Sequence, residues 1–144
     1  MILKMKKLKE NAVVPERKTD GSAGYDLCAC IEKDFVLNIG DLAIIPTGLA
    51  IEVPLGHAGM VFTRSGLGAK HGVHLSNGVG VIDSDYRGEV HVALTNSGKV
   101  PYVICPGERI AQLITMPIVL PDIELVEELT ETERGEGGFG STGR

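Results

Sequence analysis

The chain has 144 residues, of which 43% are hydrophobic and 23% charged, and its formal net charge is −5. This length suits one domain with a single core, and the composition is that of a globular protein, without an apolar run long enough to span a bilayer. The six acidic residues between 122 and 133 carry a charge of −6, whereas the whole chain carries −5, so the rest of the chain has a net charge of only +1. A nucleic-acid-binding surface usually carries a basic surplus, and we therefore expect no nucleic-acid partner.

The chain begins MILKMKKLKE, where lysines interrupt every apolar pair. This segment lacks the apolar h-region of a signal peptide, so we expect a cytoplasmic protein without membrane association. The three cysteines, Cys28, Cys30 and Cys105, are odd in number and lack CxxC spacing, which favours reduced, partly buried thiols.

Period-two alternation dominates the middle of the chain, as in Val90, Val92 and Leu94, and the apolar run 42–45 indicates a buried strand. Turn clusters that contain glycine separate the apolar segments at 38–41, 54–57, 96–99 and 105–108. Short strands joined by such turns predict an all-β sandwich or barrel. The best helix signal is Ser65–Lys70, where Ser65 is a candidate N-cap and two glycines keep the helix short.

From Pro121 onward the chain becomes acidic and then glycine-rich, ending RGEGGFGSTGR. We predict three parts: a β core over 1–120, an acidic exit segment over 121–133 and a flexible glycine-rich arm over 134–144. The plainer alternative for the last part is a frayed terminus. The formal GxGxxG match at 135–140 is not a dinucleotide fingerprint, because no strand–turn–helix unit surrounds it and only four residues follow.

Several common catalytic motifs are absent from the sequence, namely GxxxxGK[ST], GxSxG and HExxH. The four histidines lack the spacing of a metal site, so we interpret them as core or surface residues.

Five polar clusters remain: AGYDL (23–27), RSG (64–66), NGVGVIDSDYRGE (77–89), GERIAQL (107–113) and the terminal RGEGGFGSTGR. Each alone is compatible with a strand end or a surface turn. Together, and in this order, they closely resemble the homotrimeric deoxyuridine triphosphate nucleotidohydrolases, the dUTPases, over nearly the whole chain. The resemblance implies a distorted jelly-roll or β-barrel-like sandwich that forms a homotrimer with its sites at subunit junctions.

The same resemblance implies hydrolysis of dUTP to dUMP and pyrophosphate, which limits uracil in DNA and supplies dUMP for dTTP synthesis. Asp83 takes the role of the base that activates a water for attack on the α-phosphorus. Mg²⁺ is held chiefly by the triphosphate and by waters, and Asp26 reaches it only through water, with no direct protein ligand. Gln112 completes the catalytic set.

The resemblance assigns phosphate contacts to Arg64, Ser65 and the backbone of Gly66, and to Arg134 in the terminal arm. The positive end of the short helix after Ser65 adds to the same site. When the arm closes, Phe139 stacks on uracil, and further donors reach the γ-phosphate from Gly140, Ser141 and Thr142.

The nucleoside contacts fall in the third cluster. By resemblance, Asn77 binds uracil through its amide, Val81 and Ile82 line the pocket, and the backbone at His91 closes the far strand. Tyr86 packs under the deoxyribose, where a 2′-hydroxyl would lie.

Two other functions are compatible with this architecture. In related dCTP deaminases a catalytic glutamate lies ten residues beyond the equivalent of Asp83, but here that position is Ala93. A trimeric binding protein without turnover is the second alternative, and the presence of Asp83, Gln112 and Arg134 argues against it.

Overall fold

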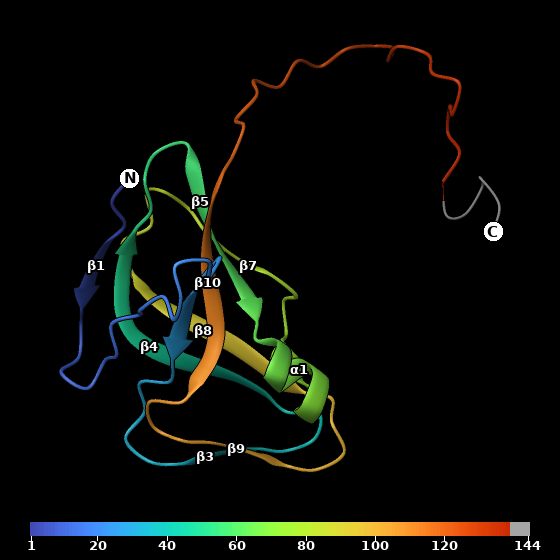
Figure 1. Cartoon of the computed structure of the whole chain (residues 1–144). Coiled ribbons are helices and arrows are strands. Elements are labelled where there is room, and N and C mark those ends of the chain that lie inside the picture. The colour runs from blue at the N-terminus through green and yellow to red at the C-terminus, as the bar shows by residue number, and fades with distance from the viewer. Residues whose placement is uncertain (139–144) are drawn as a thin grey trace.

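The protein is described by a computed structural model that covers residues 1–138. Two four-stranded antiparallel sheets and one two-stranded ribbon form the body of the domain (Figure 1). The first sheet has the order β1 (Lys4–Lys7), β4 (Leu42–Glu52), β8 (Glu89–Asn96), β6 (Val73–Leu75). The second has the order β2 (Tyr25–Cys28), β10 (Arg109–Pro117), β5 (His57–Thr63), β7 (Gly80–Ile82). The ribbon pairs β3 (Phe35–Leu37) with β9 (Tyr102–Ile104).

The core lies between the two sheets, and Figure 1 shows β10 of one sheet crossing over β4 and β8 of the other. One buried cluster takes side chains from both sheets, including Ile45 and Val92 from the first and Leu113 from the second. Along β8, inward residues alternate with outward ones, as the period-two pattern predicts. The predicted all-β, jelly-roll-like fold is confirmed.

The helix α1 (Ser65–His71) begins directly after β5. Its N-cap is Arg64, which keeps extended backbone angles and makes no side-chain capping bond. The predicted cap at Ser65 is therefore wrong, because Arg64 occupies the N-cap position and Ser65 is already the first helical residue. The buried side chain of Leu67 anchors the helix to the core.

All three cysteines are free, in agreement with the sequence prediction. Cys28 and Cys30 are buried, whereas Cys105 is exposed. Burial is the main factor that raises the pKa of the Cys28 thiol, so this group stays protonated at neutral pH. Among residues 1–138, no helix is long and apolar enough to cross a membrane.

The segment after β10 leaves the domain and extends away from it in Figure 1. Several of its large apolar side chains are almost fully exposed, namely Val119 (88%), Ile123 (97%) and Leu125 (98%). The strand itself ends at Pro117. The predicted boundaries at 120 and 133 remain predictions.

A bulge in β4 adjusts the register between the two longest strands of the first sheet. Pro46 pairs with His91 and Ala50 pairs with Glu89, so four steps along β4 match two steps along β8. Inside the bulge, the Thr47 hydroxyl donates a 2.7 Å hydrogen bond to the Val90 carbonyl. Gly48 has φ of +69°, and a Cβ built there would lie 2.7 Å from both Ala12 Cβ and Cys30 Sγ.

The bulge predicts a large difference between two glycine substitutions. Gly40 has φ of +81° but open space around it, so Gly40→Ala should cost only the left-handed strain of about 1–2 kcal/mol. Gly48→Ala should cost about 1–3 kcal/mol more, because the new methyl also overpacks the bulge. Urea denaturation of both variants measures the difference, and equal losses of unfolding free energy would contradict the packing argument.

Candidate functional site

A pocket of about 280 Å³ opens at β7, the loop after it and the first half of β8. The apolar wall of the pocket is formed by three buried side chains, those of Val61, Leu75 and Val90. The lining also includes six residues that were predicted from the sequence: Asn77, Val81, Ile82, Asp83, Tyr86 and His91. The third cluster of the sequence thus folds into one pocket.

The strand β7 explains how these side chains are presented. It pairs with β5 through Gly80–Val61 and Ile82–Gly59, and Ile82 is buried while Val81 is 62% exposed. Asp83 follows the last residue of the strand and is exposed at the pocket. The pocket therefore offers an apolar wall and one free carboxylate at its edge.

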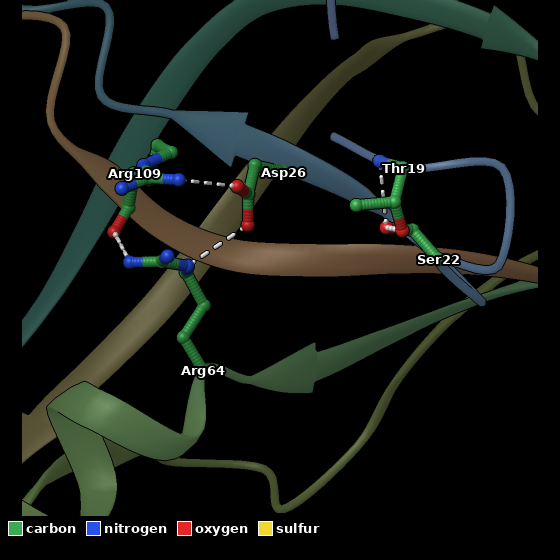
Figure 2. Close-up of polar contacts among 5 residues, drawn as sticks. All are labelled: Thr19, Ser22, Asp26, Arg64 and Arg109. Carbon is green, nitrogen blue, oxygen red and sulfur yellow. Dashed lines mark hydrogen bonds and ion pairs between the residues drawn. The ribbon is translucent and has the colours of Figure 1, made fainter. Parts of the chain in front are cut away.

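A second group of polar residues gathers where β2, β10 and α1 meet (Figure 2). Arg64 Nε donates to Asp26 Oδ1 at 2.8 Å, and Arg109 Nη1 donates to Asp26 Oδ2 at 3.1 Å. Arg64 Nη1 also donates to the Arg109 carbonyl at 3.2 Å. Two guanidinium groups against one carboxylate leave a net positive charge, which suits a phosphate ligand. We call Asp26, Arg64 and Arg109 the guanidinium cluster.

Arg109 was not among the predicted site residues, although it lies in the GERIAQL segment. A single arginine next to a turn is indistinguishable in sequence from a solvated surface charge. Its position became clear only through the pairing of Arg109 with Cys28 across β10 and β2, next to Asp26. Glu89, which lines the nucleoside-sized pocket, was missed for the same reason.

Gln112 and the start of α1 complete this second group. Gln112 lies directly opposite Asp26 in the β2–β10 pair, and its Nε2 donates to the Thr63 carbonyl at 3.2 Å. Ser65 and Gly66 follow Arg64 at the start of α1, and both are exposed. The structure thus brings five of the predicted residues into one region: Asp26, Arg64, Ser65, Gly66 and Gln112.

The pocket and the second polar group do not meet within this chain. Ile82 pairs with Gly59, so Asp83 lies level with the Ala58 end of β5, whereas Arg64 follows the other end. Six residues of strand correspond to about 20 Å. Asp83 is therefore too far from the Arg64 backbone position for both to contact one phosphate group.

Arg134 is likewise separate from the pocket. Arg134 is exposed in a turn where its Nε donates to the Gly137 carbonyl at 2.7 Å, on the segment that extends away from the domain (Figure 1). The predicted contacts of Phe139, Gly140, Ser141 and Thr142 lie outside the described residues.

No group of three or more His, Cys, Asp or Glu residues suitable for a metal occurs within 1–138. Asp26 accepts hydrogen bonds from a guanidinium group on each carboxylate oxygen. Its remaining lone pairs can still accept hydrogen bonds from the waters of a hydrated cation. Because the cluster itself is net positive, it fits Mg²⁺ only as an ion that a bound phosphate carries, contacted by Asp26 through water.

A β-sandwich with a nucleoside-sized pocket and a separate guanidinium cluster has the features of a nucleotide-binding protein. The family model described as dUTPase matches residues 10–143. The chain belongs to the dUTPase family, as its motifs suggested.

Individual relatives agree with this assignment. The deoxyuridine 5′-triphosphate nucleotidohydrolase of Desulfitobacterium hafniense is 51% identical, covering 90% of this chain and 87% of its own. The protein of the same name from Alcanivorax borkumensis is 46% identical, covering 96% of this chain and 93% of its own.

Among solved structures, the Staphylococcus bacteriophage 80alpha dUTPase with dUPNHPP has a TM-score of 0.91 at 32% identity, covering 99% of each chain. A mutant dUTPase from phage phi11 of S. aureus, whose structure concerns the coordination of a structural Mg(II) ion, has a TM-score of 0.80 at 28% identity, covering 89% and 98%.

Proposed function

We propose that this chain forms a homotrimeric enzyme that hydrolyses dUTP to dUMP and pyrophosphate inside the cell. The observation that carries the proposal is the exposed Asp83 carboxylate at the edge of a pocket that also contains Asn77 and Tyr86. The names of the relatives and the nucleotide analogue bound by the phage enzyme support this substrate. Removal of dUTP would limit uracil in DNA, and the product would supply dTTP synthesis.

The pocket has the chemistry needed for a deoxyuridine. The Asn77 amide can both donate to and accept from a uracil edge, while Val81 and Ile82 supply apolar contact. The His91 backbone closes the strand side, and the Tyr86 ring occupies the space in which a 2′-hydroxyl would be accommodated. Rejection of UTP requires that this ring be held rigidly.

In the proposed reaction, the Asp83 carboxylate accepts a proton from the attacking water. The water oxygen forms a bond to the α-phosphorus, and the bond from that phosphorus to the oxygen bridging the α- and β-phosphorus breaks. The electron pair leaves with pyrophosphate, and the other product is dUMP. Arg64 and Gln112, with Ser65 and the Gly66 amide, hold the phosphate oxygens in line for this displacement.

Mg²⁺ bound to the triphosphate would offset negative charge on the phosphate oxygens. Asp26 would hold it through water, because both carboxylate oxygens already bind guanidinium groups. The same pairing orients Arg64, so Asp26 contributes to the phosphate site by two routes.

The geometry favours a site shared between subunits. Because Asp83 and Arg64 lie at opposite ends of β5, we propose that Asp83 of one subunit acts with Arg64 and Gln112 of another. The exposed apolar side chains of residues 118–129 also call for a covering surface, which a second copy would supply. Arg134, Phe139, Gly140, Ser141 and Thr142 then close over the nucleotide as an arm.

Pyrophosphate release should occur from dUTP in the presence of Mg²⁺ and should fall strongly with UTP, dTTP and dCTP, because the pocket excludes their additional or altered groups. A coupled pyrophosphate assay with and without Mg²⁺ measures this preference. Equal rates on all four nucleotides would indicate a broad nucleotide pyrophosphatase. Ammonia release from dCTP would indicate a deaminase, although the relevant pocket position is occupied by Ala93.

Asp83→Asn should bind dUTP with nearly unchanged affinity and lose at least about 100-fold in kcat, since the amide cannot accept the water proton. Asp85→Asn is the matched control, because Asp85 is an exposed acid two residues away that does not line the pocket. Calorimetric binding and steady-state rates separate affinity from turnover. Near-normal turnover by Asp83→Asn would remove this residue from the base role.

A shared site predicts complementation between two inactive variants. If Asp83→Asn and Arg64→Ala subunits are unfolded together in equal amounts and refolded, about three in four trimers are mixed and each contains one intact site in three. Activity should rise to about a quarter of the wild-type value, whereas each variant refolded alone should stay inactive. No recovery in trimers shown to be mixed by native mass spectrometry would place the whole site in one subunit.

A further inference from the structure

Glu89 is the first residue of β8 and lines the nucleoside pocket, with its side chain only 19% exposed. The reaction proposed above assigns it no role. We infer that Glu89 is a positioning residue for Tyr86: its carboxylate fixes the start of β8 to the bulge in β4, and its carbonyl then holds the tyrosine hydroxyl. This inference rests on the proposed function, because it concerns discrimination between dUTP and UTP.

The first half of the link runs from Glu89 to the bulge. Glu89 Oε1 accepts a 2.8 Å hydrogen bond from the Gly48 N–H, in a part-buried position. Gly48 lies where four steps of β4 match two of β8, so the regular ladder is interrupted there. A buried N–H without a partner is costly, and the carboxylate therefore ties this part of β4 to the beginning of β8.

The second half runs from Glu89 to Tyr86. The Tyr86 hydroxyl donates a 2.9 Å hydrogen bond to the Glu89 carbonyl. A Cβ at Gly88 would collide with the Tyr86 ring and hydroxyl, so the ring is folded against the main chain just before Glu89. The position of the ring is thus determined by where the Gly88–Glu89 backbone lies.

Glu89 takes part in both hydrogen bonds, through its carboxylate to Gly48 and through its carbonyl to Tyr86, so the bulge and the tyrosine are connected through this one residue. A shift of the β8 start would move the Glu89 carbonyl and with it the Tyr86 ring. The ring can exclude a 2′-hydroxyl only if it cannot yield by a fraction of an ångström. The carboxylate therefore acts on sugar discrimination without contact with the sugar.

A competing explanation assigns the effect to charge. Glu89 Oε2 lies 3.7 Å from His91 Nε2, and His91 Nδ1 lies 3.0 Å from the Glu89 carbonyl. A negative carboxylate would then act through His91 and not through Gly48. The first explanation requires a side chain at residue 89 that is long enough to accept the hydrogen bond from the Gly48 N–H. The second requires a negative charge at residue 89.

Two substitutions separate reach from charge. Glu89→Asp keeps the charge but its carboxylate is one methylene too short for the Gly48 N–H, so the kcat/KM ratio of dUTP to UTP should fall about tenfold, as expected for one lost hydrogen bond to a charged group. Glu89→Gln keeps a carbonyl oxygen at the same reach, and its ratio should stay within about twofold of wild type.

A spectroscopic readout follows the hydrogen bond itself. In protein labelled with ¹⁵N-glycine, the Gly48 amide should lose hydrogen-exchange protection in Glu89→Asp and keep it in Glu89→Gln. Asn96→Ala, at the far end of β8, is the control for destabilisation alone. Its buried amide donates to the Leu37 and Val100 carbonyls, so the variant should melt at lower temperature with an unchanged nucleotide ratio.

Tyr86→Phe keeps the inference testable if Glu89→Asp does not fold. It removes the donor to the Glu89 carbonyl, so the ratio should fall while the Gly48 amide stays protected. If Glu89→Asp does fold, adding it to Tyr86→Phe should lower the ratio no further.

Two results would overturn the inference while leaving dUTP hydrolysis intact. One is a wild-type ratio in Glu89→Asp whose Gly48 amide has lost protection. The other is a reduced ratio in Glu89→Gln with Gly48 protected, which would assign the effect to charge. Wild-type enzyme that fails to hydrolyse dUTP would instead overturn the proposed function.

Discussion

The pairing of β5 with β7 on one side and with β10 on the other determines where the functional side chains lie. Its β7 edge places Asp83 near the Ala58 end of β5, and Arg64 directly follows the opposite end of the strand. Its β10 edge places Gln112 and, one strand further, Asp26 beside Arg64. The pairing therefore separates the pocket at β7 from the guanidinium cluster, which lie at opposite ends of β5.

The charge balance of the guanidinium cluster depends on a single carboxylate, that of Asp26. Asp26 neutralises one of the two positive charges of Arg64 and Arg109 and fixes the direction of both guanidinium groups. Without it, two like charges would repel each other next to the sheet edge. A net charge of about +1 remains for a ligand, while the domain outside the acidic segment stays nearly neutral. The positive charge is thus concentrated at Arg64 and Arg109 and is not spread over a broad basic surface.

The bulge in β4 connects the packing of the first sheet with the pocket. It is accommodated by the small residue Gly48 and by the Thr47 hydroxyl, and it receives the Glu89 carboxylate from β8. The same strand β8 supplies Val90 to the core and His91 to the pocket lining. The contacts that stabilise the bulge and the residues that line the pocket therefore lie next to one another on β8.

Local patterns in the sequence predicted the all-β fold class, the short helix and six of the residues that line the pocket at β7, but not Glu89. Side-chain alternation shows which of Val90 and His91 faces inward, and the third cluster folds into one pocket because its members are close in the chain.

Tertiary structure alone decided the long-range contacts. Arg64 became the N-cap because it keeps extended backbone angles between β5 and α1, and Arg109 reached Asp26 through a strand pairing that spans 83 residues of sequence. The link from Glu89 to Gly48 spans 41 residues and exists only because β4 bulges there, which no spacing of residue types encodes.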